Sequence, residues 1–341
     1  MASRGFRLPR EDQPLFDFFG GGRGGPTHSS RLSGAQIEQI RRTVGGAPEV
    51  MVKVTGGGGS VGGVAAHFAY ISHEGERDLE ADDGQRVSKQ GQKELLKDWH
   101  LELMAGQYRK LQDSKGRRVK LVHNIVLSMP APTPADKVLA AAKSFAREKF
   151  ARKHRYAMAL HTQQQHPHVH LVVKAEDEHG CRLHIAKALL REWRQDFARM
   201  MREQGIAANA TVRAVRGQSR RSARDARYRT QRHGTSYALL ARIKTVIEEL
   251  SKTGTVSDPA RSKLQQTRQM VLSGWKGIAD RLDAQGEIVL AGDVRYFARH
   301  LPSVLTDRER LAQQLLSHPR TGAPRERNRE PKREHDMERT R

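Results

Sequence analysis

The stretch RYAMALHTQQQHPHVHLVVKA occupies residues 155–175. It begins and ends with short runs rich in apolar residues, 155–161 and 168–175, which predict two strands joined by a polar loop. A loop this short joins antiparallel strands, because parallel neighbours need a longer crossover. The stretch therefore predicts an antiparallel sheet.

Three histidines of this stretch are expected to meet on one face of the sheet. Side chains two residues apart in a strand project from the same face, so His168 and His170 point the same way. His161 ends the first strand, and an antiparallel hairpin brings it beside them. Three imidazoles on a rigid sheet predict a metal site with open coordination positions, as catalysis requires. His166 lies one residue off that face and is expected to support a ligand or to contact substrate.

The three imidazoles leave the identity of the metal open. Imidazole suits Zn, Mn, Fe, Ni or Cu better than Mg. Phosphate oxygens from a substrate would shift the preference toward Mn or Mg. We therefore expect a divalent metal ion, Mg or Mn, with Zn or another transition metal as the alternative. The single cysteine, Cys181, excludes a site of several thiolates and a disulfide scaffold.

Strands and helices are expected to continue on both sides of this hairpin. Apolar and polar residues alternate over 49–55, which is typical of a strand. Further strands are expected at 119–129 and 182–185, and helices at 64–72, 92–108, 188–204 and from a cap at Thr133 to about 151. Residues 235–316 have a mostly helical pattern. These elements predict an α+β fold followed by a small helical region.

Composition divides the chain into five expected segments. Residues 1–46 contain a run of glycines and predict a flexible arm, with a short helix over 34–43. The sheet domain is expected at 47–208 and an arginine-rich linker or arm at 209–234. A helical C-terminal domain follows at 235–316, and the residues 317–341 predict a disordered charged tail.

The charge of the chain favours a polyanionic partner. Its 341 residues include 61 lysines and arginines against 38 acidic residues, a formal charge of +23. Nucleic acid is the expected partner, because we find no basic amphipathic helix with the large apolar residues that a membrane surface requires. No stretch approaches the roughly 18 apolar residues that cross a bilayer, and the first ten residues do not resemble a secretory signal. We expect a cytoplasmic protein.

Arginines are concentrated between residues 213 and 232, where eight stand against a single acidic residue. Such a segment is expected to neutralise the phosphates of a nucleic acid backbone. The candidate DNA-binding residues are Arg213, Arg216, Arg220, Arg221, Arg224 and Arg227.

A metal beside a phosphate needs a nucleophile, which is either an activated water or a side chain. The candidate side chain is Tyr70, which follows the glycine-rich stretch 56–63. That stretch has neither a Walker lysine nor a G-x-G-x-x-G spacing, so it is either a phosphate loop or a plain connector. Taken alone, Tyr70 is typical of the core face of an amphipathic helix.

Several further motifs accompany the histidine segment HTQQQHPHVH (161–170): GCRL (180–183), WRQDFA (193–198), VKVT (52–55), VLSMP (126–130) and residues 66–75 around Tyr70. Together these motifs resemble those of the relaxases, the mobilisation nucleases of conjugative elements, which include the enzymes that nick T-DNA borders. The resemblance covers about residues 48–235. A less specific resemblance, to the C-terminal portion of such proteins, lies around Trp275 and in residues 290–292 and 297–306.

The resemblance implies an HUH-endonuclease fold and a mechanism. Tyr70 would attack a phosphodiester of single-stranded DNA at a transfer origin, giving a 5′-phosphotyrosyl bond that is later reversed. A metal on His161, His168 and His170 would polarise the phosphate. The resemblance also implies an accessory DNA-binding protein and a type IV secretion coupling protein as partners, in bacterial cytoplasm.

The sequence departs from the family pattern at two positions. Relatives commonly have Asp where this chain has Gln163, and often Arg where it has His73, so both residues are treated as possible supporting or substrate-contacting groups. The motifs identify no general base, for which the candidates are Glu74, Glu80, Asp82 and Asp83. Two alternatives remain: a hydrolytic metal-dependent nuclease without a covalent intermediate, and a non-catalytic DNA-binding accessory protein.

Overall fold

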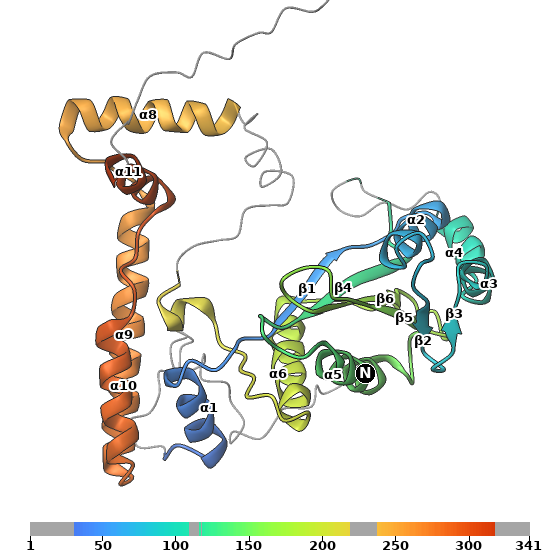
Figure 1. Cartoon of the computed structure of the whole chain (residues 1–341), viewed down its shortest axis with the longest axis horizontal. Helices are drawn as coiled ribbons and strands as arrows, with labels where there is room; N and C mark the ends of the chain where they lie inside the picture. The colour runs from blue at the N-terminus through green and yellow to red at the C-terminus, as the bar shows by residue number, and fades with distance from the viewer. Residues whose placement is uncertain (1–30, 109–115, 117, 219–236, 318–341) are drawn as a thin grey trace, which may run out of the picture. The chain divides into compact units, whose positions relative to one another are not determined.

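The computed structural model describes residues 31–108, 116, 118–218 and 237–317 (Figure 1). Most of the predicted arm, the greater part of the arginine-rich segment and almost all of the predicted charged tail lie outside these residues. The described strands are β1 (Met51–Gly56), β2 (Leu79–Ala81), β3 (Arg86–Val87), β4 (Val122–Ser128), β5 (Tyr156–His161) and β6 (His168–Lys174). They form one sheet in the order β1-β4-β6-β5-β2-β3, and every neighbouring pair is antiparallel. The predicted α+β class with a central antiparallel sheet is confirmed.

Two helices cover one face of the sheet, α5 (Ala135–Phe150) and α6 (Lys187–Glu203). Their apolar sides pack on alternate residues of the central strands in the largest hydrophobic cluster. Phe145 lies at its centre, where its ring meets Trp193 edge-on with the ring centroids 5.9 Å apart. Trp193 is only 2% exposed, because it lies on the apolar stripe of α6. This layer leaves the opposite face of the sheet available for chemistry.

Three shorter helices cover part of that opposite face: α2 (Val61–Ile71), α3 (Gly91–Asp98) and α4 (Leu101–Gln107). Phe68 of α2 packs edge-on against Trp99, with ring centroids 5.7 Å apart. A single helix was expected over 92–108, but the chain turns between α3 and α4, where His100 has a φ of +52°. The break lets both pieces press their apolar sides against the sheet.

The glycine-rich stretch before α2 is held close to β4. A Cβ atom at position 57 would lie 2.2 Å from the carbonyl oxygen of Val122 and 2.8 Å from the Lys120 side chain. Ser60 then caps α2 by accepting a hydrogen bond from the Gly63 backbone N–H at 3.2 Å. The close approach of two backbones explains the glycine at position 57.

Gly57→Ala is expected to lower the free energy of unfolding by about 1–3 kcal/mol, because the backbone of β4 must shift to admit a methyl group. Urea unfolding followed by circular dichroism measures the change. Gly62→Ala is the matched control, since nothing lies within 4 Å of a Cβ atom there and alanine favours the helix. Equal stabilities of the two variants would contradict this account of the loop.

A third hydrophobic cluster joins segments that are far apart in the sequence. It brings together α1 (Gly34–Val44), the 3-10 helix Arg213–Arg216, the second half of α9 (Ala260–Ala284) and α10 (Ile288–His300). Trp275 is fully buried in it, and its Nε1 donates a hydrogen bond to the Val215 carbonyl at 2.9 Å. The described residues within 31–216 and 270–301 accordingly form one compact unit.

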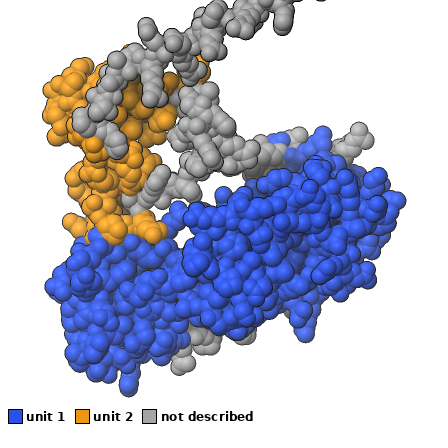
Figure 2. All heavy atoms as spheres, in the orientation of Figure 1, with its two compact units in different colours: residues 1–216, 270–301 blue, residues 217–269, 302–341 orange. Residues whose placement is uncertain are grey.

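Figure 2 shows the described residues of the second unit, within 217–269 and 302–317, in orange. They contain α8 (Tyr237–Thr253) and α11 (Asp307–Ser317), which pack together. These units differ from the predicted boundaries. Residues 270–301 were expected to belong with the rest of 235–316, but their apolar side packs on α1 and the 3-10 helix. Helix α1 agrees with the short helix expected over 34–43, although the stretch around it was expected to be a flexible arm.

Two strands also differ from expectation. Strand β2 was not predicted from the sequence; it forms where Leu79 and Ala81 are buried against the sheet. The strand expected at 182–185 is reduced to one bridge, between Glu176 and Arg182. Among the helices that the structure describes, none has the length and apolar character needed to span a membrane.

Candidate metal centre and active site

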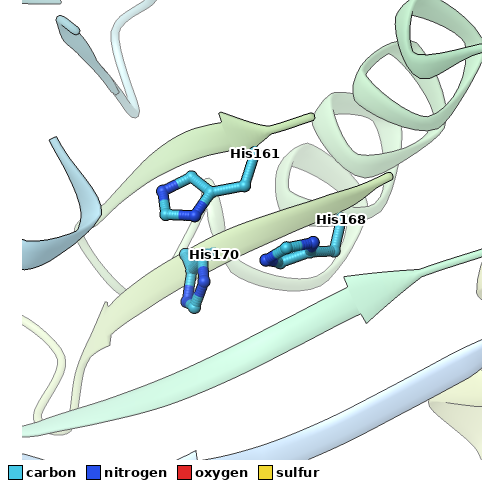
Figure 3. A group of neighbouring side chains, drawn as sticks. All are labelled: His161, His168 and His170. Atoms are coloured by element: carbon cyan, nitrogen blue, oxygen red, sulfur yellow. The ribbon is translucent and has the colours of Figure 1, made fainter. Parts of the chain in front are cut away.

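Strands β5 and β6 bring three histidines together (Figure 3). His161 lies directly opposite His168 in the register of the two strands, and His170 follows on the same face. The ring centroid of His161 is 5.2 Å from that of His168 and 4.5 Å from that of His170. One nitrogen of each ring lies within 4.8 Å of the others, which is the spacing that a shared ion requires. These residues are called the histidine triad below.

Backbone carbonyls fix which nitrogen two of these rings offer. His161 Nε2 lies 2.7 Å from the Ile71 carbonyl oxygen, and His168 Nδ1 lies 3.0 Å from that of His166. A carbonyl oxygen only accepts, so both nitrogens carry the proton and donate. The lone pairs that remain, on His161 Nδ1 and His168 Nε2, are free for a ligand. Such carbonyl partners are typical of metal-binding histidines.

The electrostatics of the site favour the neutral imidazole at two triad members, His161 and His170. Burial, followed by the neighbouring imidazoles, lowers the pKa of His170 to about 3. Burial also lowers the pKa of His161, although the Ile71 carbonyl opposes the shift. Nδ1 of His170 is buried and has no hydrogen-bond partner among the described residues. Neutral imidazoles at His161 and His170, together with the unpartnered buried nitrogen of His170, fit a divalent cation, and the triad is thus able to bind a metal.

Tyr70 lies beside the triad in the last turn of α2. Val64, Phe68 and Ile71 anchor the other side of this helix in the core, and the Tyr70 side chain is 58% exposed. Its ring centroid is 6.0 Å from that of His170 and 6.4 Å from that of His161. The core position that Tyr70 suggests when taken alone is therefore wrong. An exposed phenol beside three imidazoles is placed to meet a substrate.

Two further histidines complete the surroundings of Tyr70. The ring of His73 lies 4.5 Å from that of His161, in a turn where His73 has a φ of +51°. His67 stacks on Tyr70 at 6.0 Å and meets His170 edge-on at 6.2 Å, and burial lowers its pKa. We did not single out His67 from the sequence. Its spacing of three residues from Tyr70 in a predicted helix is the signal that would have identified it.

The other predicted supporting residues lie around the loop between β5 and β6. Gln163 is exposed in this loop. His166 is also exposed, and its Nδ1 accepts a hydrogen bond from the Ala131 backbone N–H at 3.2 Å. The backbone carbonyl of His166 accepts the hydrogen bond from His168 Nδ1 described above. His166 thus supports a triad member through its backbone.

The acidic residues considered as general bases have other partners or are exposed. Glu80 pairs with Lys143 at 2.6 Å, and Asp82 pairs with Arg155 at 2.7 Å. Asp83 accepts a hydrogen bond from the Gln85 backbone, and Glu74 is exposed. The structure therefore gives none of them a contact with Tyr70.

Of the six arginines expected to bind DNA, Arg213 and Arg216 lie in the 3-10 helix. Arg216 pairs with Glu49 at 3.2 Å, and its side chain is 20% exposed. The remaining four, Arg220, Arg221, Arg224 and Arg227, lie outside the described residues. DNA binding by these arginines stays a prediction.

An antiparallel sheet with three histidines beside an exposed tyrosine defines a domain that is able to hold a metal ion next to a candidate nucleophile. Residues 70–206 match the model of the relaxase family described as MobA/VirD2-like, nuclease domain. The chain therefore contains a nuclease domain of the relaxase family.

Similar proteins agree with this assignment. The T-DNA border endonuclease VirD2 of Rhizobium radiobacter is 28% identical over 185 residues, which are 50% of this chain and 43% of that protein. VirD2 of Agrobacterium fabrum is 27% identical over 197 residues, 53% of this chain and 43% of that protein. The chain thus spans less than half the length of these curated relatives. The match to a solved structure, "Molecular Basis of Vancomycin Resistance Transfer in Staphylococcus aureus", covers 49% of this chain and 99% of that one, with 12% identity and a TM-score of 0.33.

Proposed function

We propose that this protein is a relaxase that nicks single-stranded DNA at a transfer origin through a covalent bond to Tyr70. The observation that carries the proposal is the position of the exposed Tyr70 ring, 6.0 Å from the ring of His170. A tyrosine nucleophile has to reach the same phosphate that a metal on the triad would touch. The relaxase domain match and the border-nicking relatives support the choice of DNA as substrate.

The proposed step exchanges one phosphodiester for another. The Tyr70 oxygen forms a bond to the phosphorus and loses its proton, while the bond from phosphorus to the 3′ oxygen breaks and that oxygen gains a proton. The products are a 5′-phosphotyrosyl bond and a free 3′-hydroxyl. Attack of the hydroxyl on the phosphotyrosyl bond reverses the step and rejoins the strand. The bond count is conserved, so religation needs no other source of energy.

The residues of the chain contribute orientation to this step. Helix α2 holds Tyr70 on a rigid element, and the carbonyls of Ile71 and His166 hold His161 and His168 in single orientations. A divalent metal bound to the triad, Mg or Mn when substrate phosphate joins its ligands, would act as a Lewis acid toward the phosphate.

The wider setting of the proposal rests on family resemblance. We place the protein in conjugative DNA mobilisation in the bacterial cytoplasm. An accessory DNA-binding protein would open the origin, and a type IV secretion coupling protein would recruit the protein–DNA conjugate. The formal charge of +23 supports a DNA partner, since it favours association with any polyanion.

An adduct assay tests the proposal. The purified full chain is mixed with single-stranded DNA from the transfer origin of its own element, labelled at the 3′ end because the 5′-phosphotyrosyl bond retains that fragment, with Mn or Mg, and run on a denaturing gel. We expect a labelled band at the mass of protein plus DNA that a chelator prevents. Cleaved DNA without such a band would point to hydrolysis by an activated water. Salt-dependent binding without cleavage would point to an accessory protein without catalysis.

A further inference from the structure

Strand β1 leaves part of the sheet open beside the triad. It is the edge strand next to β4, and Met51, Lys53 and Thr55 are its exposed residues. Val52 and Val54 point to the other face, toward α5 and α6. The exposed residues therefore lie on the face that carries the histidines, on the far side of β4 from β6. Met51 and Lys53 are called the β1 strip below.

The strand register aligns the β1 strip with the triad. Lys53 lies opposite Val126, and Val126 lies opposite His170. Met51 in the same way lies opposite Ser128, and Ser128 opposite His168. Figure 3 shows β4 beside β6, and β1 beyond β4. Directly opposite residues share a face, and neighbouring strands are about 4.8 Å apart, so the Lys53 backbone lies about 10 Å from that of His170.

The β1 strip has the chemistry of a nucleic acid surface. Lys53 is exposed and forms no ion pair with any residue in the described part of the chain, whereas Lys143 and Lys149 pair with acidic residues. Met51 is 42% exposed, a large apolar side chain without cover. The side chains between the strip and the triad, Val126 and Ser128, are short and buried. A phosphate neighbouring the one at the triad would lie within reach of the long lysine side chain.

We propose that the β1 strip binds the single-stranded DNA next to the scissile phosphate. The Lys53 ammonium contacts the neighbouring backbone phosphate, and the Met51 side chain packs on a base. The inference rests on the proposed function, because the triad has to hold the scissile phosphate. It assigns a binding role to the lysine of the VKVT motif, for which the phosphotyrosyl chemistry gives no use.

The test separates the two contacts by their salt dependence. Binding of the fluorescent origin oligonucleotide is measured in chelator, so that no cleavage occurs, between 0.05 and about 1 M salt. Each phosphate neutralised on single-stranded DNA adds about 0.7 to the slope of log affinity against log salt. Lys53→Gln is expected to reduce the slope by about 0.7 and to weaken binding about fivefold at 0.1 M salt. Lys53→Arg is expected to keep the slope, because it keeps the charge.

Met51→Ser is expected to weaken binding about two- to fivefold at every salt concentration, because it removes apolar contact area and no charge. The matched control for Lys53→Gln is Lys137→Gln, which removes the same charge from an exposed position on α5, on the other side of the sheet. Equal slopes for Lys53→Gln and Lys137→Gln would overturn the inference.

The adduct assay on the same proteins separates this inference from the proposed function. If the wild type forms the adduct but Lys53→Gln and Lys137→Gln have equal salt slopes, the proposed function stands and DNA binding by the β1 strip is refuted. A reduced slope for Lys53→Gln in a protein that forms no adduct would support the strip as a DNA surface and refute the tyrosine chemistry.

Discussion

Tyr70→Phe is expected to abolish the covalent protein–DNA adduct, a loss of at least about 10³-fold in the rate of its formation. Phenylalanine keeps the ring that stacks on His67 but lacks the oxygen that would bond to phosphorus. The Tyr70 side chain is 58% exposed, so the free energy of unfolding is expected to change by less than about 0.5 kcal/mol. Binding of single-stranded DNA is expected to remain within about twofold of the wild type, since the change removes no charge.

The measurement is a time course of adduct formation on denaturing gels, with the bond located by protease digestion and mass spectrometry. Tyr296→Phe is the matched control, because Tyr296 is 61% exposed on α10, an element that contributes no residue to the triad. It is expected to form the adduct at the wild-type rate. An adduct that persists in Tyr70→Phe would show that another residue is the nucleophile.

Replacement of a triad histidine is expected to produce the second large effect. His168→Ala or His170→Ala removes one of three nitrogens that lie within 4.8 Å of one another. Loss of a residue that merely supports a metal ligand costs about 10–100-fold in affinity, and loss of a ligand itself is expected to cost at least about 100-fold. Adduct formation is expected to fall by a similar factor.

Metal affinity provides a readout that does not depend on activity. Addition of Mn at 100 times its dissociation constant is expected to stabilise the wild type by about 2.7 kcal/mol, and this gain is expected to vanish in His168→Ala and His170→Ala. Thermal unfolding with and without the ion measures it. His184→Ala, which alters an exposed histidine outside the triad, is the control. A gain of the same size in His170→Ala would mean that the ion binds elsewhere.

The triad could be predicted because its geometry is local. Two histidines at i and i+2 share a strand face whatever surrounds them, and a six-residue loop between two strands allows the strands to pair in an antiparallel hairpin. The register His161 opposite His168 follows from that hairpin. The sequence could not show that Tyr70 is exposed, because α2 is apolar on several sides and only its packing on the sheet decides which side is buried.

The unit boundaries depend on contacts between distant residues and could not be predicted. Ile40 and Leu290 lie in one cluster although 250 residues separate them, and no local pattern records such a pairing. Strand β2 has three residues, too few to show a period of two. The helix expected over 92–108 broke at His100 because tertiary packing overrode a continuous helical pattern.

The hydrogen bond between His161 and Ile71 has an electrostatic consequence. The Ile71 carbonyl belongs to the last turn of α2, where carbonyl groups lack partners within the helix. The aligned peptide dipoles of a helix place about half a negative elementary charge at this end. Helix α2 therefore points the negative pole of its dipole at the imidazoles, and the element that carries Tyr70 also lowers the electrostatic cost of placing a cation there.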